Sequence, residues 1–199
     1  MAKEIERKFL VTSDAWRAEA TGKLYCQGYL ATAVRGQSVR VRIVGAHGYL
    51  TIKGPATGLS RAEFEYPIPM ADAREMLTTL CRQPLIEKIR YRLPIGPVTW
   101  EIDEFKGENA GLIVAEVEVV SEEQTVDLPD WIGEEVSGDP KYYNASLVQT
   151  PYASWPPNCR RAAGWRFVRS HPFWPQAAHR HPKFPLKTSA LGLYPWSQG

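Results

Sequence analysis

Residues 4–9 have the sequence Glu-Ile-Glu-Arg-Lys-Phe, which places Glu4, Glu6 and Lys8 on one side of an extended chain. Alternation with a period of two predicts a β-strand, because successive side chains of a strand point to opposite faces of the sheet. The polar side of a half-buried strand is usually of mixed character, whereas here every polar position is ionised. This stretch therefore predicts a strand with one strongly charged face.

The same pattern recurs along the first 150 residues, and each stretch tends to carry charges of one sign. The stretches are Arg40–Arg42, Leu50–Lys53, Glu63–Glu65, Lys88–Arg90, Glu101–Asp103 and Glu116–Glu118. Turn-forming residues at 45–48, 96–97 and 106–111 separate several of them. Seven or eight strands with a few short helices predict an α+β fold that is mainly antiparallel β, a barrel or strongly curved sheet with short helices packed outside.

Capping residues and apolar spacing predict the helices. Residues 13–20 begin at a serine cap, and residues 71–82 place apolar side chains on one face before Pro84 ends the segment. Ser121 and Gln124 fit a capping box, and Asp139-Pro140 fits a cap followed by proline at the first helical position.

The charged faces have two possible locations. On the outside they would form salt-bridge ladders in water. Inside a closed barrel they would be costly to bury without partners. The repetition of same-face pairs favours the interior, as a wet channel that holds a polyanion and divalent metal ions. Arginine forks bind phosphate oxygens, and carboxylates bind Mg²⁺ or Mn²⁺.

Composition and motifs exclude several classes of protein. No run of 18 uncharged apolar residues exists, and the charged N-terminus is unlike a signal peptide, so a cytoplasmic protein that does not enter a membrane is expected. Cys26, Cys81 and Cys159 form no CxxC pair, which argues against a disulfide framework or a structural zinc site. Walker A, GxSxG and HExxH motifs are absent from the sequence.

The ordered set of charged stretches, beginning with the ExExK motif of residues 4–8, resembles the CYTH domain of the triphosphate tunnel metalloenzyme superfamily. The resemblance covers about residues 2–150. It implies an eight-stranded antiparallel tunnel that binds a triphosphate and a divalent metal, Mg²⁺ or Mn²⁺. Members include inorganic tripolyphosphatases, thiamine triphosphatases, RNA triphosphatases and class IV adenylate cyclases.

The resemblance also implies a role for each charged position. The metal ligands would be Glu4, Glu6, Glu116 and Glu118, with Asp103 completing the set. The phosphate-binding residues would be Lys8, Arg40, Arg42, Lys53, Lys88 and Arg90, with Lys141 at the tunnel mouth. The supporting carboxylates would be Glu63, Glu65 and Glu101. Lys8, Lys88 and Tyr29 are the predicted catalytic residues, and Tyr29 is expected to reach the lumen and to hydrogen-bond a lysine such as Lys88.

These features predict metal-dependent hydrolysis of the terminal phosphate of inorganic tripolyphosphate. The sequence shows no element that would recognise adenine. Alternatives left open are a nucleoside or thiamine triphosphatase, a class IV adenylate cyclase, and a polyphosphate-binding module without catalysis. A homodimer is also left open, and nucleic acid is not an expected partner.

Residues 151–199 differ in composition from the rest of the chain. They contain 7 basic and no acidic residues, 8 of the 16 prolines and 4 of the 7 tryptophans, whereas residues 1–150 have a net charge of −5. This shift predicts a domain boundary near Pro151, followed by a basic extension that is expected to be poorly ordered. A polyanion-attracting arm and a partner-binding strap are the functional alternatives for this extension.

Overall fold

The computed structural model describes residues 3–32 and 37–163 of the chain. The strands are β1 (Lys3–Val11), β2 (Thr21–Thr32), β3 (Ser38–Val44), β4 (His47–Lys53), β5 (Ser60–Ile68), β6 (Ile86–Ile95), β7 (Val98–Phe105), β8 (Ile113–Glu118) and β9 (Ile132–Glu135). The α-helices are α1 (Met70–Thr79), α2 (Asn144–Gln149) and α3 (Pro157–Ala163), and the 3₁₀ helices are η1 (Ala15–Glu19), η2 (Gly107–Asn109), η3 (Pro140–Tyr142) and η4 (Tyr152–Ser154). No helix in the described ranges has the length and apolar character needed to cross a bilayer.

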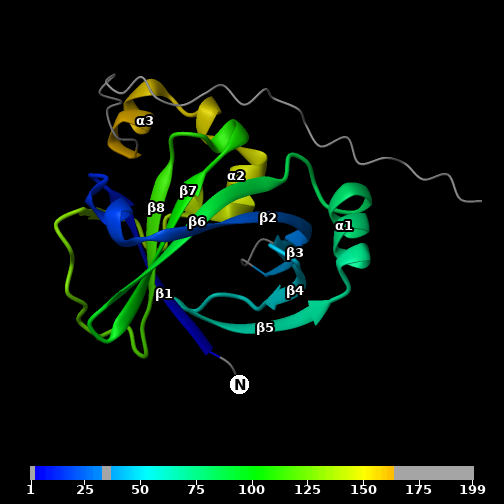
Figure 1. The fold of residues 1–199 in the computed structure, drawn as a ribbon, viewed down its shortest axis with the longest axis horizontal. Coiled ribbons are helices and arrows are strands. Elements are labelled where there is room, and N and C mark those ends of the chain that lie inside the picture. The colour runs from blue at the N-terminus through cyan, green and yellow to red at the C-terminus, as the bar shows by residue number, and fades with distance from the viewer. Residues whose placement is uncertain (1–2, 33–36, 164–199) are drawn as a thin grey trace, which may run out of the picture. The chain divides into compact units, whose positions relative to one another are not determined.

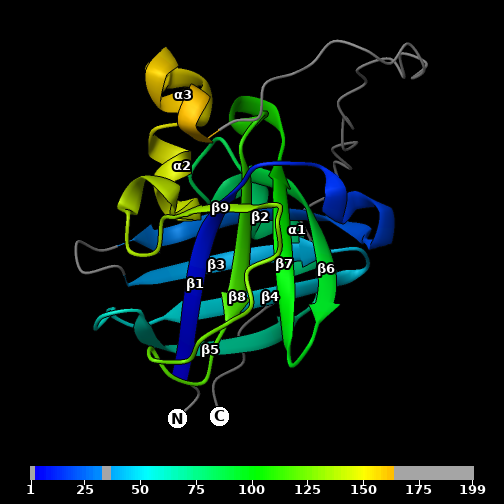
Figure 2. The same ribbon diagram turned by 90° about the vertical axis from the view of Figure 1, so that its left-hand side faces the viewer.

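The first strand closes the sheet into a barrel. Residues 3–5 of β1 pair with β5, and residues 6–10 pair with β8. The full order is β5-β4-β3-β2-β6-β7-β8-β1, with β9 added beside the end of β1 (Figure 2). Every neighbouring pair is antiparallel. The predicted eight-stranded antiparallel barrel is confirmed, with one extra strand.

Cross-strand register brings the ionised positions together on the inner face. Lys53 of β4 lies opposite Glu63 of β5, and Arg90 of β6 lies opposite Asp103 of β7. Since residues opposite each other in a ladder point to the same side of the sheet, the charges of several strands meet in the interior. They do not form a solvated outer face.

The outer face of one half of the barrel is a buried apolar layer. Trp100 and Ile102 of β7 and Val117 of β8 are almost completely buried there. Trp16 of η1 and Trp131, which precedes β9, cover them. Removing these large side chains from water contributes about 2 kcal/mol each, which makes this layer a main source of stability.

Helix α1 covers the outer face on the other side, beside β2, β3 and β4 (Figure 1). Its Ala73 and Leu77 pack with Val41 of β3. A Cβ atom at Gly48 would lie 2.8 Å from Ala73 Cβ, and one at Gly28 would lie 2.7 Å from Cys81 Cβ. These two glycines therefore let the helical segment approach the strands closely.

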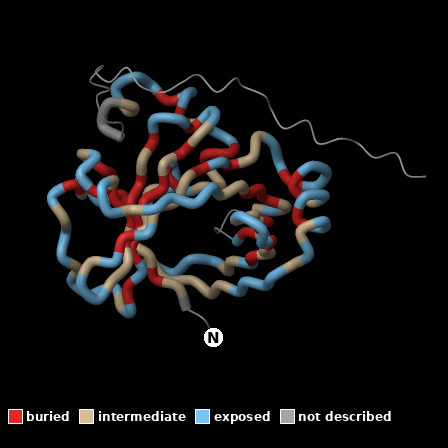
Figure 3. Tube along the Cα trace, viewed as in Figure 1, coloured by how far each residue is buried: buried red, intermediate tan, exposed pale blue. Residues whose placement is uncertain are grey.

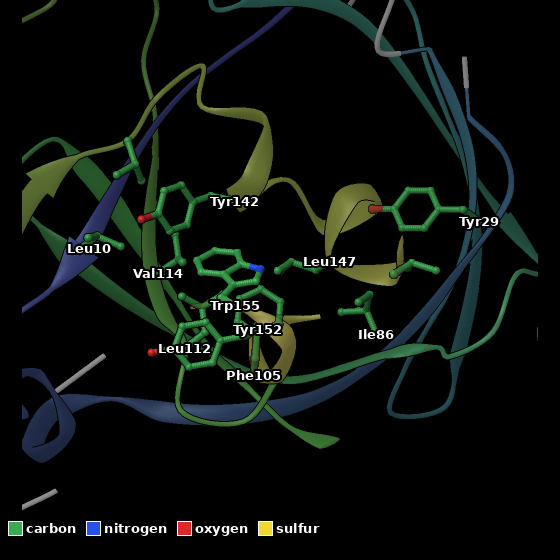
Figure 4. Packing of buried hydrophobic residues seen from close by; sticks show 12 residues of the cluster. Leu10, Tyr29, Ile86, Phe105, Leu112, Val114, Tyr142, Leu147, Tyr152 and Trp155 are labelled. Atoms are coloured by element: carbon green, nitrogen blue, oxygen red, sulfur yellow. The ribbon is translucent and has the colours of Figure 1, made fainter. Parts of the chain in front are cut away.

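One end of the inner face is apolar. Leu10, Ile86, Phe105 and Val114 occupy the same alternating positions as the charged residues of their strands, yet they pack in one cluster with Leu147 of α2 (Figure 4). The prediction that the short helices pack outside the barrel thus holds for α1, whereas α2 packs against this apolar end of the inner face.

The packed structure continues past residue 150, where the sequence placed the domain boundary. Tyr152 and Trp155 are buried in the same cluster as α2 (Figure 4). Figure 3 shows buried segments running through the strands of the barrel. Their rings meet edge to face with centroids 5.2 Å apart, and Tyr142 meets Trp155 in the same way at 5.4 Å. Aromatic pairs of this geometry stabilise a core. Residues 164–199 lie outside the described ranges.

The helix predictions have mixed outcomes. The segment 71–82 is α1, and the segment 13–20 is the short 3₁₀ helix η1. Asp139 accepts a hydrogen bond from the Lys141 backbone N–H at the start of η3, as a cap should. The predicted capping box is wrong, because Gln124 accepts the N–H of Val120 in a turn that starts no helix.

Candidate active site

A cavity of about 820 Å³ lies inside the barrel. Twelve of the residues singled out in the sequence line it: Glu4, Glu6, Lys8, Tyr29, Arg40, Arg42, Lys53, Glu63, Arg90, Glu101, Glu116 and Glu118. They come from every strand of the closed barrel, so the site exists only when the sheet is closed.

Three further predicted residues contact this lining without being part of it. Lys88 and Asp103 are almost completely buried, and Lys88 Nζ donates to Asp103 Oδ2 at 2.5 Å. Arg90, which reaches the cavity, donates to both oxygens of Asp103 at 2.6 Å. Glu65 accepts a 2.6 Å hydrogen bond from Arg42 Nη2 and lies 3.6 Å from Arg40. The carboxylates of Asp103 and Glu65 therefore hold cations of the cavity wall in place.

Lys141 is the predicted residue that the structure does not bring to the cavity. Its ammonium lies 3.5 Å from Asp139 and over the rings of Tyr142 and Trp155, 4.7 and 5.6 Å from their centroids. The cap turn at Asp139 and the two aromatic rings turn this side chain away from the lumen. We therefore remove Lys141 from the candidate site.

Glu4 is held by two cations. Lys53 Nζ donates to its carboxylate at 2.8 Å, and Arg61 Nε donates at 2.9 Å. Burial alone would raise the pKa of Glu4, but the charges of Lys53 and Arg61 lower it to about 2. Glu4 is therefore ionised at any ordinary pH.

Glu6 lies two residues further along the same strand, in the opposite electrostatic situation. Burial and the charge of Glu116 raise the pKa of Glu6 to about 7, and Lys8, 3.8 Å away, compensates only in part. Its register partner on β8 is another carboxylate, Glu118. The carboxylate of Glu6 therefore has too little positive charge around it.

Glu116 has two close cationic partners. Its carboxylate accepts hydrogen bonds from Lys8 Nζ and from Arg90 Nη2. The charges of Lys8 and Arg90 outweigh the effect of burial and lower the pKa of Glu116 well below its usual range. The same ion pair raises the pKa of Lys8, although burial alone would lower it.

The pKa of Lys88 is lowered, in contrast to that of Lys8. Burial and the neighbouring Arg90 guanidinium lower the pKa of Lys88 to about 8, and Asp103 compensates only in part. A buried ammonium beside a second cation is poorly stabilised. Additional negative charge near Lys88, such as that of a bound polyanion, would stabilise its ammonium form.

Tyr29 reaches the cavity as predicted, but its predicted hydrogen bond with Lys88 is absent from the described residues. The hydroxyl instead accepts a hydrogen bond from Gln27 Nε2 at 3.2 Å. Cross-strand register explains the difference, because Tyr25, not Tyr29, lies opposite Lys88. Burial raises the pKa of Tyr29, which keeps the phenol protonated near neutral pH.

Two buried guanidinium donors in the described residues have no partner, Nε of Arg40 and Nε of Arg42. Buried donors are normally satisfied, and an orphan costs about 1–3 kcal/mol. Both side chains line the cavity. Unpaired donors on two neighbouring arginines are suited to phosphate oxygens.

The carboxylates fit a divalent metal by their chemistry. Mg²⁺ and Mn²⁺ prefer hard oxygen ligands, which Glu6, Glu116 and Glu118 offer from the adjacent strands β1 and β8. As the side chains stand, no three His, Cys, Asp or Glu residues of the described ranges are gathered closely enough to hold a metal ion. Several of the carboxylates bond cations instead. The raised pKa of Glu6 nevertheless indicates a place where positive charge is missing.

Two lumen residues escaped the sequence analysis. Arg61 lines the cavity and bonds Glu4, and Gln27 is fully buried beside Tyr29. Alternation could have found both, since Arg61 stands two residues before Glu63 and Gln27 two before Tyr29. Arg61 escaped because it precedes the stretch in which the alternation is clear, and Gln27 because it carries no charge.

Comparisons with known proteins agree with this geometry. The family model described as the CYTH domain matches residues 2–152. A curated relative from Acetivibrio thermocellus, named inorganic triphosphatase, is 51% identical over 155 residues, which are 78% of this chain and 99% of the relative. A second curated relative of the same name, from Nitrosomonas europaea, is 38% identical over 153 residues, 73% of this chain and 96% of the relative.

A solved structure agrees as well. The crystal structure of an inorganic triphosphatase is 34% identical to this chain, with a TM-score of 0.53. The match covers 76% of this chain and 99% of that one. These similarities cover the barrel, and the family model ends at residue 152.

Proposed function

The chain belongs to the CYTH domain family, and on that basis we propose that it hydrolyses the terminal phosphate of inorganic tripolyphosphate inside the barrel. Two relatives that carry the name inorganic triphosphatase, matched along nearly their whole length, support the choice of substrate. The products are phosphate and diphosphate.

The observation that carries this proposal is the cation set of the cavity. Lys8, Lys53, Arg40, Arg42, Arg61 and Arg90 line one cavity, and two of the arginines hold donors without partners. In the structure these cations contact carboxylates. A compact polyanion can replace these carboxylates as the partner of the cations, because phosphate oxygens accept hydrogen bonds as carboxylate oxygens do.

We propose that the divalent metal ion binds to carboxylates of the cavity. We assign Glu4, Glu6, Glu116 and Glu118, with Asp103 behind them, to holding Mg²⁺ or Mn²⁺. When bound, such an ion supplies positive charge to the phosphate oxygens and lowers the pKa of bound water.

The protein's own side chains account for the remaining requirements of phosphoryl transfer. The reaction mainly needs the phosphates to be positioned and their developing charge to be neutralised. Lys8 and Arg90 share Glu116, so both cations stand at one point of the cavity wall. Lys88 shares Asp103 with Arg90. Water attacks the terminal phosphorus, the bond to the bridging oxygen breaks, and diphosphate leaves.

The test is phosphate release from tripolyphosphate with Mg²⁺ and then Mn²⁺, with ATP in parallel and Lys8→Ala as the control. Rapid release from tripolyphosphate, slow release from ATP and loss in the variant are the expected results. Turnover of ATP alone would transfer the proposal to a nucleotide enzyme. Tight tripolyphosphate binding without release under either metal would leave only a binding module.

A further inference from the structure

Gln27 has no role in the chemistry described so far, although it lies inside the barrel. It is on β2 between Tyr25 and Tyr29, on the inner side of the strand, and it is 0% exposed. Burying an amide is costly unless its atoms are hydrogen-bonded. Its Nε2 donates to the Tyr29 hydroxyl at 3.2 Å. The burial of this amide beside a tyrosine that lines the cavity therefore calls for a physical explanation.

The other end of the amide has no partner. Gln27 Oε1 is buried and accepts no hydrogen bond from the described residues. The residue opposite Gln27 on β3 is Arg42, whose Nε–H is also unpartnered. A carbonyl oxygen is the favourable end of an amide to face a guanidinium, and the reverse orientation would turn an NH₂ group toward it. In the structure the Nε2 end of Gln27 meets Tyr29, and the Oε1 end has no partner among the described residues.

This orientation decides how Tyr29 can use its proton. A phenol has one proton, and the Tyr29 oxygen already accepts from Gln27. The proton is therefore free to be donated, and no described residue accepts it. Tyr29 lines the cavity, and its ring extends from the barrel wall toward α2 (Figure 4). The available acceptor is whatever occupies the lumen.

We propose that Gln27 is a positioning residue that orients the Tyr29 hydroxyl as a neutral hydrogen-bond donor to a phosphate oxygen of the bound substrate. The inference rests on the proposed function for the identity of that substrate. It assigns Tyr29 a different role from a proton shuttle paired with Lys88, since Tyr29 keeps its proton throughout. Gln27 acts only through Tyr29.

Four variants test this inference, Gln27→Met, Gln27→Glu, Tyr29→Phe and the double variant Gln27→Met/Tyr29→Phe. We expect a loss of about tenfold in kcat/KM for tripolyphosphate in each of the two single variants Gln27→Met and Tyr29→Phe. The double variant should lose no more than Tyr29→Phe alone, because residues that act as one unit are not additive.

Gln27→Glu separates positioning from packing. Glutamate keeps the shape of glutamine and places a negative charge across the strand pair from the Arg42 cation, so the fold should tolerate it. It has no N–H to donate, however, and as an acceptor it claims the Tyr29 proton. Positioning therefore predicts that Gln27→Glu is at least as damaging to kcat/KM as Gln27→Met. A packing role predicts that Gln27→Glu is the milder change.

The same proteins are titrated with tripolyphosphate in EDTA, which reports binding without turnover, and thermal melting reports whether each variant is folded. Losses that multiply in the double variant, or a Gln27→Met protein within twofold of the wild type in both assays, would overturn the inference. If the wild type releases no phosphate, the proposed function fails on its own. The coupling between Gln27 and Tyr29 is then read from the binding titration.

Discussion

Neighbouring residues of one strand show how differently the two faces of the barrel use burial. Ile102 and Asp103 follow each other on β7, and both are 0% exposed. Ile102 points outward into the apolar layer with Trp100. Asp103 points inward and accepts hydrogen bonds from Lys88 and Arg90.

The comparison shows that equal burial has opposite energetic meaning on the two faces. Burying Ile102 stabilises the fold directly. Burying Asp103 is tolerated only because cations compensate it, and a buried ion pair is weak evidence for stability. The outer face therefore maintains the barrel, and the inner face keeps charges ready for a ligand. Substitutions on the inner face should cost function, and substitutions on the outer face should cost folding.

The largest effect is expected on the inner face. Glu4→Gln with Glu6→Gln should reduce metal-dependent turnover of tripolyphosphate by about 10⁴-fold or more, because two hard-oxygen ligands are lost. Far-UV circular dichroism should match the wild type. Glu75→Gln on the exposed side of α1 is the matched control and should keep full turnover. Wild-type rates in the double variant would place the metal elsewhere.

The outer face should respond in the opposite way. Trp100→Ala should lower the free energy of unfolding by about 3–5 kcal/mol, because the ring is fully buried and packs edge to face with Phe9 and Trp131. Urea unfolding measures this loss. At a temperature where the variant is folded, kcat should stay within a few-fold of the wild type. A catalytic loss without a stability loss would contradict the division between the faces.

The pH dependence of the free energy of unfolding should show that Glu6 has too little positive charge around it. Its pKa is raised from 4.5 to about 7 in the folded protein, so the folded state binds the proton more tightly. The resulting stability is fully present below pH 4.5 and is lost as the pH rises through 7, by up to about 3 kcal/mol. Urea unfolding in EDTA between pH 5 and pH 8 measures it.

Glu6→Gln is the control for this pH prediction, since it removes the titrating group. Its stability should vary less with pH over the same range. The lowered pKa of Glu4 does not interfere, because its effect falls below pH 4.5. Identical pH dependence in the variant and the wild type would disprove the assignment to Glu6.

Arg61 offers a further test of the inner face. It supports Glu4 and lines the cavity, so Arg61→Gln should raise the KM for tripolyphosphate about tenfold, equivalent to about 1.4 kcal/mol. Arg74→Gln, an arginine substitution on the exposed surface of α1, should leave KM unchanged. Equal KM values in both variants would exclude Arg61 from the binding site.

The smallest effect is expected on the part of the outer face that lies outside the three apolar clusters. Phe64→Thr on β5 should change the free energy of unfolding by no more than about 0.5 kcal/mol, since Phe64 is 42% exposed. Val41→Thr under α1 should cost more, because it buries a hydroxyl in an apolar cluster. Sedimentation velocity on the wild type and Phe64→Thr also tests the homodimer that the sequence leaves open. A larger loss in Phe64→Thr would show that a partner covers this strand.

Alternation along the chain was enough to predict which residues share a face. Since a strand repeats every two residues, Glu4, Glu6 and Lys8 must point the same way wherever the strand lies. The charged stretches therefore predicted the barrel class and most of the lumen. Arg61 and Gln27 follow the same parity and could have been included, but one lies outside the clear alternation and the other is uncharged.

Only the tertiary structure decided how the charges are partnered. Lys8 meets Glu116, and Lys53 meets Glu4, across strands that are far apart in sequence. These contacts depend on barrel closure and register, which no local pattern contains. For the same reason the structure alone separates Glu4, with two cations, from Glu6, with too few. Local alternation determines the direction of a side chain, whereas pKa and chemistry depend on the neighbours that the closed barrel brings to it.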